Sequence, residues 1–283
     1  MKIPKKFSEI KNFNLELISK NFGLQKSEIS LLKESLKCEG STCGDFNKKA
    51  IKEIDFIYCY LPLPKPKLGL NQKVTDFFIC KEPSTGWVKG NQNNAWSKVN
   101  EHNIINFIGN DIKLKKLQVL FISYFNVFPE GKFYITDLSK CAMNVKHNKI
   151  EALNRYKCCQ SLLELEINKY TDSSTRFYLV GDNKEDTYVS LRKFIKERTI
   201  TPLPHYAIQI SCPDFINDMY FYARGTDENE ILKEIFLGYN QLGEKLSNNF
   251  NLPFIPNLIK KESVPPTNIL LYSIYKSCFE RSK

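Results

Sequence analysis

The chain has 283 residues, of which 42% are hydrophobic and 13% aromatic, so it can bury a real core and is excluded from the disordered class. Its net charge of +10 favours a polyanionic partner such as DNA, although a Lys-rich composition can also reflect a biased genome. No run approaches eighteen apolar residues and no secretory segment follows Met1, so the sequence predicts a soluble, cytoplasmic protein without a membrane partner, and we expect a monomer.

The elements predicted in chain order alternate between helices and strands. Helical spacing covers Phe7 to Leu36, and prolines exclude regular helix between Leu61 and Lys67. The predicted strands are Thr75 to Cys80, Phe133 to Thr136, Arg176 to Gly181 and one that ends at His205. The later predicted helices are Val99 to Phe125, Ile150 to Tyr170, Asp186 to Lys196, and Asp227 to Leu246, which starts with a capping-box-like Asp227 and Glu230.

This alternation predicts an α/β fold, specifically a three-layer αβα sandwich with a mainly parallel central sheet and helical additions at both termini. We expect three parts: residues 1–60 as an N-terminal helical segment with a first cysteine pair, 61–215 as the α/β core, and 216–283 as a helical extension packed on that core. Nine cysteines in a reducing compartment argue against a disulfide framework, which leaves core packing or metal binding.

Three apolar runs end abruptly in polar, glycine- or proline-bearing sequence, as buried strands do at the carboxyl edge of an α/β sheet: FFICKEPSTGW (Phe77 to Trp87), FYITDLSKC (Phe133 to Cys141) and ITPLPHY (Ile200 to Tyr206). Together they resemble the GEAPG-like, TN-x-x-KC and PHPS motifs of the uracil-DNA glycosylase superfamily, most closely its iron–sulfur branch. The resemblance spans Cys38 to Tyr206. It implies that superfamily's fold and an enzyme that flips a nucleotide and hydrolyses its N-glycosidic bond.

Two residues match catalytic positions of these motifs. The resemblance implies that His205 donates a hydrogen bond to O2 of the flipped pyrimidine, where charge accumulates in the transition state. It implies that Glu82 orients the attacking water and stabilises positive charge on the sugar. Taken alone, His205 would be interpreted as a residue that caps a strand end, and Glu82 could equally be an ordinary loop carboxylate. The motif positions expected to contact DNA are Lys81, Ser84, Lys140 and Tyr206.

Asp137 stands where the family has an asparagine that reads uracil. An ionised aspartate only accepts hydrogen bonds, so it would repel O4 of uracil and suit the amino group of cytosine. The alternative is that Asp137 caps the following turn and the base is read elsewhere. Trp96 and Trp87 flank the loop after Glu82, where the family has an aromatic side chain that stacks on the flipped base, although most tryptophans are core residues.

Four cysteines fall where the iron–sulfur glycosylases have their thiolate ligands. The last begins a C-x-x-x-L-E-x-E-I stretch, and Cys158 could substitute for it. The resemblance implies a [4Fe–4S] cluster, with zinc as the competing occupant of a four-thiolate site. The four predicted ligands are Cys38, Cys43, Cys141 and Cys159.

The sequence thus predicts a monofunctional DNA glycosylase, because no lysine occupies a motif position that suggests a Schiff base. Asp137 favours a modified cytosine over the uracil that the family implies by default in base-excision repair. A hypermodified phage base, removed in antiviral defence, is one substrate of this kind. A catalytically inactive DNA-binding protein of the same fold is the other alternative, supported by departures from the motifs at Lys81, Asp137 and Tyr206.

Overall fold

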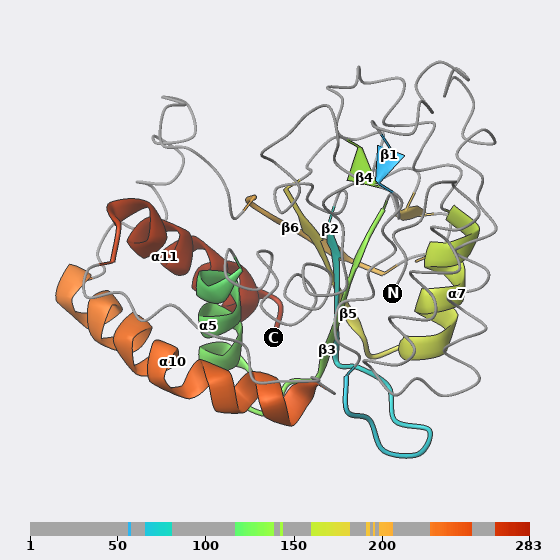
Figure 1. Cartoon of the computed structure of the whole chain (residues 1–283), viewed down its shortest axis with the longest axis horizontal. Helices are drawn as coiled ribbons and strands as arrows, with labels where there is room; N and C mark the ends of the chain where they lie inside the picture. The colour runs from blue at the N-terminus through green and yellow to red at the C-terminus, as the bar shows by residue number, and fades with distance from the viewer. Residues whose placement is uncertain are drawn as a thin grey trace, which may run out of the picture.

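The structure is a computed structural model that describes residues 56–57, 66–80, 117–138, 142–143, 160–181, 191–192, 195, 198–205, 227–250 and 264–283. The predicted helices within Phe7 to Leu36 lie outside these residues. In chain order the elements shown in Figure 1 are β1 (Phe56–Ile57), β2 (Asp76–Cys80), α5 (Gln118–Val127), β3 (Phe133–Asp137), β4 (Ala142–Met143), α7 (Gln160–Tyr170), β5 (Arg176–Val180), β6 (Ile200–Leu203), α10 (Glu228–Asn249) and α11 (Pro266–Arg281).

Four of the strands form one parallel sheet in the order β3-β2-β5-β6. Its inner strands β2 and β5 are almost continuous apolar runs, DFFIC and RFYLV, as strands covered on both faces require. The strands β1 and β4 pair separately and antiparallel. The prediction of a mixed α/β fold with a parallel sheet is confirmed, and three predicted strands agree with β2, β3 and β5 within one residue at each end.

Helices pack against both faces of this sheet, because successive side chains of a strand point to opposite faces. One core joins α5, α10 and α11 to Phe78, Ile135 and Tyr178, and the other joins α7 to Phe77 and Leu179. Figure 1 shows the same division, with α7 on one side of the sheet and the other three helices on the opposite side.

The strand β6 ends earlier than predicted. It contains Pro202 and stops at Leu203, before a second proline, whereas the sequence predicted a strand continuing to His205. Proline lacks the N–H that a sheet ladder needs. Among the described strands β6 pairs with β5 alone, and an edge position of this kind tolerates Pro202. His205 therefore lies in the segment that follows the strand.

The helix α10 is capped at both ends by side chains. Its predicted start is confirmed, because the Asp227 carboxylate accepts a hydrogen bond of 2.9 Å from the backbone N–H of Asn229. At the other end, Lys67 Nζ donates to the carbonyl of Ser247 at 2.7 Å. A cation there complements the partial negative charge of a helix C-terminus.

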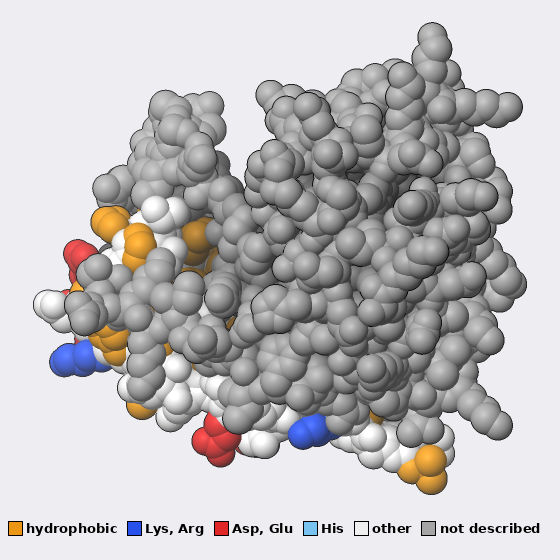
Figure 2. All heavy atoms as spheres, in the orientation of Figure 1, with side chains coloured by type: hydrophobic (Ala, Val, Ile, Leu, Met, Phe, Trp, Pro, Cys, Tyr) orange, Lys and Arg blue, Asp and Glu red, His pale blue; other side chains and the backbone are white. Residues whose placement is uncertain are grey.

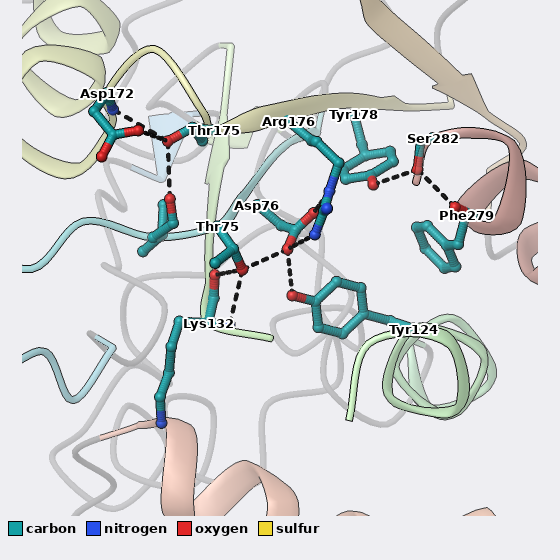
Figure 3. Close-up of polar contacts among 11 residues, drawn as sticks. Thr75, Asp76, Tyr124, Lys132, Asp172, Thr175, Arg176, Tyr178, Phe279 and Ser282 are labelled. Atoms are coloured by element: carbon teal, nitrogen blue, oxygen red, sulfur yellow. Dashed lines mark hydrogen bonds and ion pairs between the residues drawn. The ribbon is translucent and has the colours of Figure 1, made fainter. Parts of the chain in front are cut away.

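A charged network lies at the amino edge of the sheet (Figure 3). The fully buried Asp76 accepts hydrogen bonds from Arg176 Nε (2.7 Å) and Nη2 (2.8 Å), from Tyr124 (2.6 Å) and from Thr75 Oγ1 (2.6 Å). Burial raises the pKa of the Tyr124 hydroxyl well above its usual range, and the nearby charge of Asp76 raises it further. Burial is the largest single influence on the pKa of Arg176 and acts to lower it, but the hydrogen bonds to Asp76 and the negative charge of that carboxylate, with smaller contributions from Tyr178 and Tyr124, together raise it. The network joins β2, β5 and α5.

The C-terminal helix α11 is part of the same core. Its Phe279 is fully buried and its ring contacts those of Phe78, Tyr124 and Tyr178 on three different elements. Just beyond the helix, Ser282 forms a hydrogen bond of 2.8 Å with the Tyr178 hydroxyl. The last turn of α11 and Ser282 thus cover side chains of β2 and β5 on this face of the sheet. Among the helices that the structure describes, none combines the length and apolarity needed to cross a membrane.

Candidate functional site

The carboxyl ends of the four parallel strands form one row. Cys80 of β2 pairs with Asp137 on one side and Val180 on the other, and Val180 pairs with Leu203 of β6. Neighbouring strands lie about 4.8 Å apart, so the two ends of this row are separated by roughly 14 Å. Asp137 ends β3 at one extreme, and His205 follows β6 at the other.

The order of the strands marks a particular point on this edge. From β2 the chain crosses to β3 on one side, and from β5 it crosses to β6 on the other side. Between β2 and β5 the direction of the connections therefore reverses. Open α/β sheets bind their ligands outside the carboxyl ends of the strands at such a switch point. In the sequence, Lys81 directly follows β2 and Gly181 directly follows β5, the two strands on either side of the switch point.

His205 lies against Gly181, beside this switch point. A Cβ atom built on Gly181 would be 2.5 Å from Cδ2 of the imidazole, so the ring packs directly on the glycine backbone. The N–H of Gly181 also donates to the carbonyl of Leu203 at 2.8 Å, and Tyr275 of α11 donates to the carbonyl of Pro204 at 2.9 Å. Two elements thus hold the backbone immediately before the partly buried His205.

Asp137 is 7% exposed and lies on the same face of the sheet as Phe133 and Ile135. Its cross-strand neighbour on that face is Cys80, also buried. The ladder continues one residue further, because the N–H of Leu138 donates to the carbonyl of Cys80 at 2.8 Å. The carboxylate is therefore carried by a strand end that is hydrogen-bonded to its neighbour β2.

A second carboxylate supports β3 from the opposite face. Glu166 of α7 is 0% exposed and accepts hydrogen bonds from Thr136 Oγ1 (2.8 Å) and from the Tyr134 hydroxyl (3.1 Å). A buried carboxylate is tolerable only with such partners. From the sequence we considered Glu166 only as the second glutamate of the C-x-x-x-L-E-x-E-I stretch and did not predict this contact. The available signal was its spacing of three and four residues from Leu163 and Tyr170, which puts a charge on the apolar stripe of α7.

Of the predicted site residues, the structure brings Asp137 and His205 to the same edge of the sheet. The others lie outside the described residues, so their predicted roles stay predictions. They are Glu82, Trp87, Trp96, Lys81, Ser84, Lys140 and Tyr206, and the four cysteines Cys38, Cys43, Cys141 and Cys159. Within the described ranges, no group of three or more His, Cys, Asp or Glu side chains could hold a metal ion.

The residues that carry the excess positive charge, like most of the predicted site residues, lie outside the described ranges. The described residues include as many Lys and Arg as Asp and Glu, so the net charge of +10 comes entirely from the remaining residues. Figure 2 shows both basic and acidic side chains on the described surface. Several described lysines serve the fold: Lys132 Nζ and Lys245 Nζ, like Lys67, donate to backbone carbonyls.

Similarity to known proteins adds no further assignment. A scan against models of protein families and a search of curated proteins gave no match to this chain. Function is therefore inferred from the carboxyl edge of the sheet and from the sequence motifs that end there.

Proposed function

We propose that this chain is a monofunctional DNA glycosylase, which flips a pyrimidine nucleotide out of DNA and hydrolyses its N-glycosidic bond. The observation that carries the proposal is the position of Asp137 and His205, which belong to separate sequence motifs, at the same carboxyl edge on either side of the switch point. A flipped base lying over the carboxyl ends of β2 and β5 would have Asp137 on one side of it and His205 on the other. The motif resemblance to the uracil-DNA glycosylase superfamily supports the same activity.

Each residue has a defined task in this reaction. His205 donates a hydrogen bond to the pyrimidine O2 as the bond to the sugar breaks, so it stabilises charge that exists only in the transition state. Glu82, the second residue after β2, orients the water and stabilises the developing charge on the sugar. Asp137 accepts a hydrogen bond from the base, and Trp87 or Trp96 replaces the stacking lost on flipping.

The direct experiment is to incubate the protein with DNA duplexes and single strands that each carry one modified base. Alkali then cleaves any abasic site, and the shortened strand is measured. We expect cleavage with a cytosine-derived base. Binding of DNA without cleavage of any member of the panel would favour the catalytically inactive alternative, and excision of uracil would favour a role in base-excision repair.

Asp137 should decide which base is released. We expect the wild-type protein to release a cytosine-derived base and to ignore uracil, because O4 of uracil would oppose the carboxylate in a site with little water. Asp137→Asn supplies an amide donor and should shift the preference toward uracil. The measurement is the ratio of single-turnover rates on matched duplexes.

The matched control is Asp172→Asn. Asp172 is an exposed turn residue at the amino edge that accepts a hydrogen bond from the N–H of Ser174 at 2.9 Å. This control should leave the base preference unchanged. Rapid excision of uracil by the wild-type protein, with no change of preference in Asp137→Asn, would show that Asp137 does not read the base.

The cysteine set makes a prediction about metal content. We expect purified protein to be brown and to contain iron, and Cys141→Ser or Cys159→Ser to lose both the colour and part of the stability, because cluster binding is linked to folding. Visible absorbance and elemental analysis measure the first effect and thermal unfolding the second. Cys278→Ser, in the buried face of α11, is the control that should stay brown. A colourless native protein without iron would contradict the cluster, and one zinc ion per chain would assign the site to zinc.

A further inference from the structure

Gly181 has a backbone conformation that a side chain disfavours. Its φ is +78°, in the left-handed region where a Cβ atom meets the neighbouring carbonyl. The residue directly follows β5, and its N–H continues the ladder by donating to Leu203 at 2.8 Å. The conformation is therefore set by the sheet and is not that of a loosely held turn.

The space beside Gly181 is already occupied by the imidazole. A Cβ atom on Gly181 would lie 2.5 Å from Cδ2, 2.9 Å from Cβ and 3.0 Å from Cγ of His205. Carbon atoms do not approach so closely without repulsion, since their optimal separation is about 3.5–4.0 Å. This contact with the ring is a second reason, separate from the positive φ, why a side chain is disfavoured at position 181.

Relief of such a collision would fall on the histidine side chain. The backbone before His205 is held by Gly181 at the carbonyl of Leu203 and by Tyr275 at the carbonyl of Pro204. A Cβ at position 181 would therefore displace the imidazole: rotation about χ1 relieves the contacts with Cγ and Cδ2, and the contact with Cβ requires a small shift of His205 itself.

We propose that Gly181 is a positioning residue, whose missing side chain sets the orientation of the His205 imidazole at the switch point between β2 and β5. The inference rests on the proposed function for its effect on rate, because a displacement of about 1 Å in a catalytic group can slow a reaction 10²-fold. The effect on the ring itself does not depend on that function.

The test combines Gly181→Ala with NMR of the histidine rings. The chain has only three histidines, so ¹H–¹⁵N imidazole spectra are simple, and loss of a signal in His205→Ala assigns that ring. In Gly181→Ala we expect the His205 signals alone to shift and base release to slow by about 10–10²-fold. Gly69→Ala is the matched control, because its Cβ would meet its nearest atom, Oε1 of Gln72, at an ordinary 3.4 Å.

A double-variant cycle separates this role from a general effect on folding. His205→Gly removes the three atoms that lie nearest to the new Cβ, so Gly181→Ala should reduce the melting temperature less in that background than in the wild type. In the His205→Gly background, Gly181→Ala should also cause no further slowing of base release. This melting comparison remains possible if Gly181→Ala folds poorly by itself.

Two outcomes would overturn the proposal. One is unchanged His205 signals in Gly181→Ala, and the other is an equal loss of melting temperature in the presence and absence of the imidazole. If no base is released by the wild-type protein, the proposed function fails, whereas the NMR and melting results still decide whether Gly181 positions His205.

Discussion

Replacing His205 with Ala is expected to slow base release by on the order of 10²–10³-fold while the affinity for DNA stays nearly unchanged. The reason is that its hydrogen bond acts on charge that develops only as the glycosidic bond breaks. Single-turnover rates at saturating enzyme measure the chemical step, and a fluorescence titration with uncleaved DNA measures binding.

Thr199→Ala is a suitable control, because Thr199 is exposed and precedes β6 at the opposite edge of the sheet. Glu82→Gln should also slow the reaction, since an amide cannot orient water or stabilise a cation as a carboxylate does. If His205→Ala weakens DNA binding as much as it slows base release, then His205 positions DNA, and its proposed role as a transition-state donor is wrong.

Replacing Asp76 with Ala should lower the free energy of unfolding by about 3–5 kcal/mol, as expected when one partner of a buried ion pair is removed. Asp76 accepts four hydrogen bonds, so its loss leaves the buried Tyr124 hydroxyl and the Arg176 guanidinium without their acceptor. The Arg176 side chain is 29% exposed and regains some contact with water, which favours the lower end of this range. Urea denaturation measures the change.

Two further variants test the cause. Tyr124→Phe removes one donor and should lower the free energy of unfolding by about 1 kcal/mol. Asp172→Ala, in an exposed turn, should have a smaller effect than Asp76→Ala. A loss of under 1 kcal/mol in Asp76→Ala would show that water or a rearranged side chain replaces the carboxylate.

Local sequence was sufficient to predict the main elements. The runs at Phe77 and Phe177 are apolar at successive positions, which identifies a strand covered on both faces, and Asp227 ahead of a periodic stretch identifies the start of α10. The helix α11 was not predicted by itself, although Pro265 and Pro266 are typical of a helix start. These features depend on neighbours within a few residues in the chain.

The candidate site was predictable only in part. Asp137 and His205 could be selected because each lies at the carboxyl end of a predicted buried strand, and chemistry in α/β folds collects at that edge. Their separation depends on the strand order, which four similar apolar runs do not specify by themselves. Only pairing between residues far apart in the chain makes β2 and β5 neighbours.

The residue types at strand ends and the periods of the apolar runs can thus be identified from the sequence alone, because the backbone geometry of a single strand or helix decides which of its own residues are buried together. The contact of His205 with Gly181, the partners of Glu166 and the network around Asp76 arise only when distant segments pack together. A glycine or a carboxylate has no local pattern that reveals which side chain will lie against it, since that depends on how the strands and helices are arranged in space.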